Sequence, residues 1–176
     1  DLTILLPAAK SALPLVHALL FVAIYWVALF TVGRVRALVG ITALLLDPFL
    51  LGLSRLLHID ALMSELMLLS ILSLLPSLRR RSLWPVAFSG VMAGLATLNK
   101  SSGVLLVPVA FCTLFYAAWN ARLGARREGS TAPGVKWTSG ALLSMMLWAL
   151  CAVLAFCILW PAMWVAPLST LSRLVH

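Results

Sequence analysis

Residues 11–33 read SALPLVHALLFVAIYWVALFTVG and contain no charged side chain. A helix needs about 20 apolar residues to cross a bilayer core about 30 Å thick. This stretch meets that requirement, and the imidazole of His17 is its only strongly polar side chain. The sequence therefore predicts a membrane-spanning helix here, followed at once by Arg34 and Arg36.

The whole chain has the composition of a membrane protein. Of its 176 residues 63% are hydrophobic and 10% are charged, and the mean hydropathy is +1.09. Soluble domains contain about 45–50% apolar and about 25% charged residues, so a water-soluble enzyme or binding module is excluded. The net charge of +8 does not indicate nucleic acid as a partner, because the basic residues lie in the connections between apolar runs. The three cysteines lie within apolar runs, which favours free packing cysteines over disulfides.

The apolar runs predict an all-α, polytopic transmembrane helical bundle of about six spans in a single module over 1–176. The expected spans are 11–33, 37–53, 61–78, 83–98, 104–119 and 137–165. A polar loop, 120–136, separates the last two.

The arginines and lysines predict the orientation of these spans. With six spans, the connections form two alternating sets. One set holds nine basic residues, namely Arg34, Arg36, Arg79, Arg80, Arg81, Arg122, Arg126, Arg127 and Lys136, and the other holds Lys10, Arg55, Lys100 and Arg173. Since lysine and arginine are retained on the cytoplasmic side, we expect the richer set to be cytoplasmic and both termini to face outward.

Polar residues gather on the expected outward side. Asp47, Arg55, His58 and Asp60 occur in the connection between the second and third spans, and Lys100 follows the short fourth span. Ionisable groups at membrane depth normally face a protein interior or a watery cavity. Arginine binds phosphate oxygens in a fork and lysine acts as a point charge. Arg55, His58 and Lys100 therefore predict a binding site for a lipid-linked phosphate.

Each of these residues also has a plain structural interpretation. Arg55 can extend to lipid headgroups, His58 can lie at the interface, and Asp60 can cap the third span. Asp47, which precedes a proline, can mark a local break or pair with another helix. Glu65 does not share a helical face with Asp60, so we expect it to contact a helix outside this chain and assign it no role. No spacing of histidines and acids predicts a metal site.

Gly90 and Gly94 have the G-x-x-x-G spacing that permits close contact between helices. Their span, 83–98, is short for the bilayer. We therefore expect Lys100 to lie slightly below the outer interface and to face a cavity.

The ordered set Asp47-Pro48, Ser54-Arg55, Asp60-Ala61 and Gly94-Leu95-Ala96 leading to Lys100 resembles the dolichyl-phosphate-mannose protein mannosyltransferase family. The related bacterial aminoarabinose transferases share the pattern, and the segment 159–164, Leu-Trp-Pro-Ala-Met-Trp, is similar to their bacterial members. The resemblance covers about 37–164. It implies a partial membrane module of the GT-C type.

The resemblance also implies the chemistry. A sugar would pass from a polyprenyl-phosphate donor to a protein, lipid or glycan acceptor on the extracytoplasmic face of a bacterial plasma membrane. Arg55 and Lys100 would stabilise the departing phosphate, His58 would add a hydrogen bond, and Asp60 and Asp47 would orient the connection. The acidic base of such enzymes belongs to an earlier extracytoplasmic loop. We therefore expect no catalytic base in this chain, which would be an internal fragment that is inactive alone, and we identify no cofactor.

Two other function classes fit the intramembrane charges. A transporter or flippase of lipid-linked or small solutes is the main alternative, although the first and last three spans show no inverted repeat. A structural membrane subunit is the other. Stoichiometric release of polyprenyl phosphate distinguishes a transferase from both.

Overall fold

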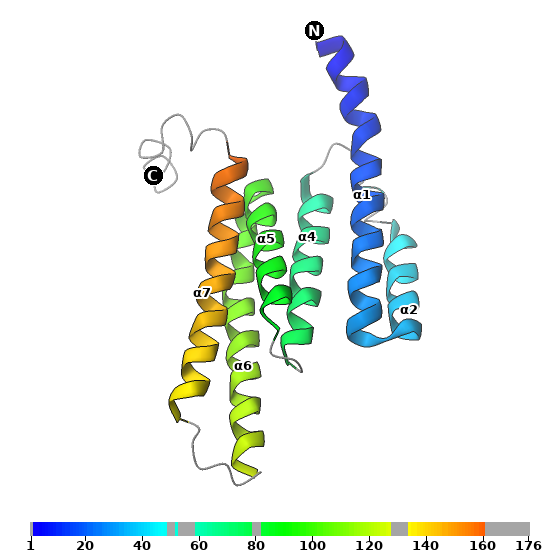
Figure 1. The fold of residues 1–176 in the computed structure, drawn as a ribbon. Helices are drawn as coiled ribbons and strands as arrows, with labels where there is room; N and C mark the ends of the chain where they lie inside the picture. Colours follow the sequence, from blue (N-terminus) through cyan, green and yellow to red (C-terminus); the bar gives the residue numbers. More distant parts are fainter. Residues whose placement is uncertain (1, 49–51, 53–58, 79–81, 128–133, 161–176) are drawn as a thin grey trace.

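The computed structural model describes residues 2–48, 52, 59–78, 82–127 and 134–160, and all regular structure in them is helical (Figure 1). The helices are α1 (Leu2–Val32), α2 (Arg34–Leu45), α4 (Ile59–Leu74), α5 (Leu83–Asn99), α6 (Leu106–Arg127) and α7 (Gly134–Leu159). Two 3₁₀ turns extend them, Leu75–Leu78 after α4 and Ser101–Leu105 before α6. This confirms the expected all-α class.

The helices run alternately down and up in Figure 1, from α1 downward to α7 upward. The α1–α2 turn and the ends of α4 and α6 therefore lie at the lower end of the bundle, and the turn between α5 and α6 lies at the upper end. Arg34 begins α2 at the lower end, whereas Lys100 directly follows α5 at the upper end. For these residues the alternation expected from the sequence matches the path of the chain.

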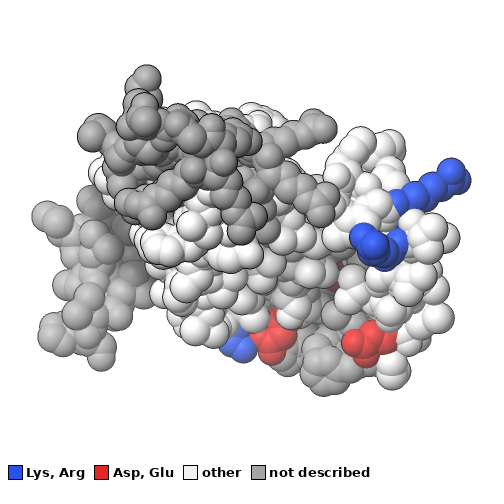
Figure 2. Space-filling view, turned by 90° about the horizontal axis from the view of Figure 1, so that it is seen from below, with Lys and Arg blue, Asp and Glu red and all other residues white. Residues whose placement is uncertain are grey.

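Four helical segments are long and apolar enough to cross a membrane: Ala12–Val32, Asp60–Ser77, Ser101–Asn120 and Gly140–Leu159. The shorter α5 is also apolar. Bulky side chains such as Trp26, Phe30 and Phe115 are exposed on these helices, and most of the described surface in Figure 2 is uncharged. The chain is therefore an integral membrane protein, with four of the six expected spans matched by long apolar helices.

The α1–α2 hairpin turns at Gly33, whose φ of 92° is a conformation that favours glycine. The second helix of the hairpin has only 12 residues. The chain turns at Leu46, because Pro48 disfavours a helical conformation at Asp47 and cannot supply an amide donor. The expected span 37–53 thus contains a helix that ends at Leu45, and most of 49–58 lies outside the described residues.

The core lies among α4, α5, α6 and α7. Its buried residues are Leu66, Leu74, Val86, Ala93, Ala96, Leu106, Ala110, Leu114 and Trp148. Two glycines let α5 and α7 approach closely. A Cβ added at Gly90 would lie 2.4 Å from the Trp148 carbonyl oxygen, and one at Gly94 would lie 2.3 Å from the Ala152 carbonyl oxygen. The predicted packing role of this glycine pair is confirmed.

A buried polar network joins three of these helices. The Ser70 hydroxyl of α4 lies 2.9 Å from the Ser89 hydroxyl of α5 and donates to the Ser89 carbonyl at 3.0 Å. The Trp148 indole N–H of α7 donates to the Ser89 hydroxyl at 3.1 Å. Because polar atoms in hydrocarbon need partners within the protein, this network fixes α4, α5 and α7 relative to one another.

Candidate functional site

An ion pair lies where α4 begins and α5 ends. The Lys100 ammonium is 2.6 Å from the Asp60 carboxylate, and the two side chains are 44% and 31% exposed. Asp60 occupies the first turn of α4, where a carboxylate complements the positive end of the helix dipole. The pair therefore presents an accessible cation on a fixed support at the upper end of the bundle.

The turn that carries Lys100 has a defined backbone. The Lys100 amide donates to the Ala96 carbonyl at 3.0 Å, and its own carbonyl accepts from Gly103 at 2.9 Å. A Cβ at Gly103 would lie 2.5 Å from the Thr97 nitrogen, so the turn requires a glycine there. These contacts direct the chain from α5 into α6 and hold Lys100 beside the start of α4.

A hydrogen bond from Ser102 to the Met63 sulfur, 3.0 Å long, also joins the turn to α4. The turn and α4 are thus linked by this hydrogen bond as well as by the ion pair.

The other predicted site residues are less fully placed. Arg55 and His58 lie outside the described residues. Asp47 follows α2 and is partly buried, and its amide donates to the Leu44 carbonyl at 3.3 Å. Asp60 is expected to orient the connection between the second and third spans, and in the structure its carboxylate contacts Lys100. Of the predicted site residues that the structure describes, Asp60 and Lys100 are in direct contact.

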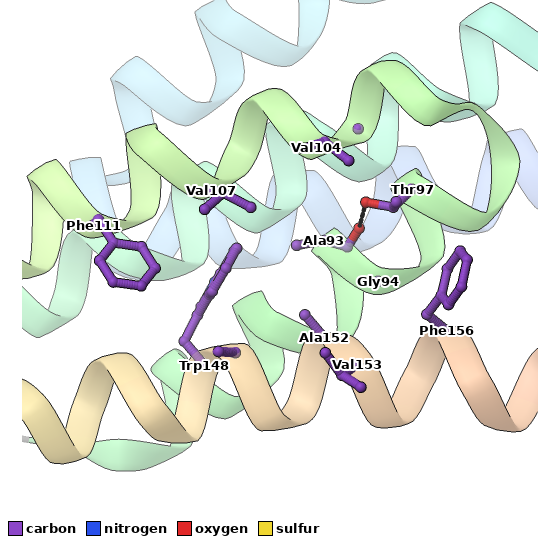
Figure 3. A pocket seen from close by; sticks show the side chains of 12 residues that line it. Ala93, Gly94, Thr97, Val104, Val107, Phe111, Trp148, Ala152, Val153 and Phe156 are labelled. Atoms are coloured by element: carbon purple, nitrogen blue, oxygen red, sulfur yellow. Dashed lines mark hydrogen bonds between the residues drawn. The ribbon is translucent and has the colours of Figure 1, made fainter. Parts of the chain in front are cut away.

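An apolar cavity of about 390 Å³ lies beside this turn, between α5, α6 and α7 (Figure 3). Its lining is Ala93, Gly94, Thr97, Gly103, Val104, Val107, Phe111, Trp148, Ala149, Ala152, Val153 and Phe156. The Thr97 hydroxyl donates within its own helix to the Ala93 carbonyl at 2.9 Å, which leaves the walls nearly free of polar groups. Two of the lining residues, Thr97 of α5 and Gly103 of the turn, are three residues before and after Lys100 in the sequence, whereas Lys100 itself does not line the cavity.

A second polar pair lies deep in the bundle. The Nδ1 atom of His17 on α1 lies 2.8 and 2.9 Å from the two carboxylate oxygens of Glu65 on α4. Both side chains are almost fully buried. The expectation that Glu65 contacts a helix outside this chain is therefore wrong. The sequence carried a signal for this contact, since two ionisable residues in apolar spans tend to pair, but nothing in it gave the partner.

Among the residues that the structure describes, no three His, Cys, Asp or Glu side chains come together as metal ligands. The candidate site thus consists of an exposed ion pair, a defined turn and an apolar cavity. The Lys100 ammonium can attract an anion, and the cavity can take an apolar group.

Comparison with known proteins identifies the family. A sequence model of the family described as dolichyl-phosphate-mannose-protein mannosyltransferase matches residues 11–165, which is most of the chain. No curated protein and no solved structure gives a significant match. The family match agrees with the helical membrane architecture and with the resemblance of the motifs around Asp47, Asp60 and Lys100. The chain therefore belongs to the dolichyl-phosphate-mannose-protein mannosyltransferase family of membrane glycosyltransferases.

Proposed function

We propose that this protein transfers a sugar from a polyprenyl-phosphate donor to an acceptor on the extracytoplasmic face of the membrane. The observation that carries the proposal is the exposed Asp60–Lys100 pair at 2.6 Å, at the start of a turn whose Gly103 lines an apolar cavity. The family match supports the reaction class.

Lys100 would bind the donor phosphate. Its ammonium has three N–H donors, and one of them is occupied by Asp60. The other two can serve phosphate oxygens, while Asp60 prevents the flexible side chain from turning away. Arg55, five residues before Asp60 in the sequence, would supply a second and forked contact to the phosphate. His58 would add a hydrogen bond.

The apolar cavity would take the first part of the prenyl chain. Its volume of about 390 Å³ falls within the range of about 300–1,000 Å³ typical of ligand pockets. The twelve lining residues present carbon surface and almost no polar surface (Figure 3). A lipid phosphate seated at Lys100 could thus enter the cavity near Thr97 without exposing its chain to water.

The chemistry would be a substitution at the anomeric carbon of the sugar. The bond between this carbon and the phosphate oxygen breaks, and a bond to the acceptor oxygen forms. Negative charge grows on the departing polyprenyl phosphate, and Lys100 with Arg55 would stabilise it. Such electrostatic stabilisation is usually the largest catalytic contribution. The acceptor proton would pass to an acidic residue of a preceding extracytoplasmic loop, as the family resemblance implies.

The direction of the site follows from charge. Nine of the thirteen lysines and arginines belong to the set of connections that alternates with the set holding Lys100, and the positive-inside rule assigns the richer set to the cytoplasm. The end with Asp60 and Lys100 would then face outward, where a lipid-linked donor is consumed. The acceptor would reach it from the aqueous side.

Product stoichiometry tests the proposal. The full-length protein, in membranes, is given a polyprenyl-phosphate sugar labelled in both the sugar and the phosphate. We expect one polyprenyl phosphate to appear for each sugar transferred to the acceptor. Movement of intact donor across the membrane, without release of polyprenyl phosphate, would contradict the proposal and favour a flippase.

A further inference from the structure

The α1–α2 hairpin meets the rest of the bundle mainly through one helix. It packs through α1 against α4, and Figure 1 shows it at the side of the bundle formed by α4, α5, α6 and α7. The helix α2 packs on α1 and ends just before Asp47. The position of α1 on α4 therefore determines where this end of the hairpin lies relative to Asp60.

The contact between α1 and α4 contains one buried polar pair, His17 with Glu65. The two residues are 3% and 2% exposed. Toward the lower end, the inward stripe of α1 continues with Leu20, Ile24 and Ala28, which are apolar. Apolar helices in lipid have no hydrophobic force to select one register, whereas a hydrogen bond between them does favour a particular register.

His17 makes no other side-chain hydrogen bond in the part of the chain that the structure describes. Its buried Nε2 atom has no hydrogen-bond partner among the described residues. The ring is thus held by Glu65 alone, and both residues are too buried to touch a substrate. Glu65 lies five residues after Asp60, or about 7.5 Å farther along α4. The pair is well placed to position the site and not to react in it.

We propose that His17 and Glu65 are positioning residues that fix the register of the α1–α2 hairpin on α4. Through this contact they determine the position of Asp47, at the end of α2, relative to the Asp60–Lys100 pair. The proposal rests on the proposed function for its effect on transfer. Its structural part, the fixed register, stands independently of that function.

A distance measurement tests the structural part. In the full-length protein, Cys112, Cys151 and Cys157 are replaced by alanine, and spin labels are attached at Val39→Cys on α2 and Phe115→Cys on α6. Both positions are exposed. We expect a narrow distance distribution, which broadens or shifts in Glu65→Ala and in His17→Ala. The exchanged variant His17→Glu with Glu65→His should restore it, because the pair is re-formed.

A matched control separates register from general destabilisation. Ser70→Ala removes a buried hydrogen bond of α4 that points to α5 and not to α1. It should leave the α2–α6 distance unchanged. Equal broadening in Ser70→Ala, or no change in Glu65→Ala and His17→Ala, would overturn the proposal.

Transfer kinetics test the effect on the site. Glu65→Ala should raise the KM for the lipid-linked donor by about threefold to tenfold. This factor corresponds to the free energy that one hydrogen bond between membrane helices typically contributes. The exchanged pair should recover most of that loss. A broadened distance with unchanged KM would overturn the positioning role while keeping the register. If the wild-type protein transfers no sugar, the proposed function fails, and the distance measurement still decides the register.

Discussion

Helix α4 carries two acid–base pairs that differ in burial and in partner. Asp60, in its first turn, pairs with Lys100, and the two side chains are 31% and 44% exposed. Glu65 pairs with His17, and these side chains are 2% and 4% exposed. Both contacts are shorter than 3 Å, so distance alone does not distinguish them.

Their surroundings do distinguish them. An exposed ion pair contributes at most about 1 kcal/mol to stability, which leaves its cation able to bind another anion. A buried pair in a membrane span has no access to ligand and must find its partner within the protein. The exposed pair is therefore suited to bind substrate, and the buried pair is suited to hold helices together.

The largest effect that would test this contrast is expected from Lys100→Ala. Removing a group that stabilises developing charge typically costs about 10²-fold in rate, so kcat/KM for the lipid-linked donor should fall by about that factor. Stability should change little, since the pair is exposed. Initial rates and thermal unfolding of the full-length protein measure the two quantities.

Arg34→Ala is the matched control, because Arg34 is an exposed cation at the opposite end of the bundle. It should retain the wild-type rate, and Lys100→Arg should retain part of it. A Lys100→Ala variant as active as Arg34→Ala would show that the exposed pair is not a substrate site.

Gly94→Val tests whether the Asp60–Lys100 pair depends on the close packing of α5 against α7. Its Cβ would lie 2.3 Å from the Ala152 carbonyl oxygen, so α5 must move away from α7. We expect a loss of about 1–3 kcal/mol in stability, the usual cost of overpacking. Transfer should also fall, because Lys100 directly follows α5. Gly40→Val is the control, because a Cβ there would meet nothing within 4 Å. Equal thermal stability of the two variants would refute the close α5–α7 contact.

Asp60→Asn should have a smaller effect on transfer than Lys100→Ala. The amide still contacts Lys100 but no longer attracts it by charge, so positioning weakens while the ammonium remains. We expect kcat/KM to fall by about fivefold, which corresponds to about 1 kcal/mol. A larger loss than in Lys100→Ala would mean that the carboxylate itself acts on substrate.

Most of the helical architecture was predictable from the apolar runs. The expected span 83–98 corresponds closely to α5, Leu83–Asn99, because hydropathy and helix coincide there. The expected span 104–119 is shorter than the helix that contains it, because α6 continues to Arg127. Residues 120–127 favour a helix through alanine, leucine and arginine, although they are too polar to lie in lipid. Hydropathy predicts the membrane segment and not the end of its helix.

The site was predictable in its residue types but not in its pairings. Asp60 and Lys100 stood out as ionisable groups at the ends of apolar runs. Their contact joins residues 40 positions apart, and the His17–Glu65 contact joins residues 48 apart. Neither pairing follows from spacing within one helix. The cavity could not be predicted from the sequence either, since its walls come from three helices and consist of ordinary apolar residues.

The most direct test of the central claim is photolabelling of the full-length protein with a polyprenyl-phosphate sugar that carries a diazirine in its first isoprene units. We expect the label on the cavity walls of α5, α6 or α7, with protection by excess unlabelled donor and loss of labelling in Lys100→Ala. Labelling confined to α1 and α2, or labelling that unlabelled donor does not reduce, would contradict a donor site at Lys100 and the cavity.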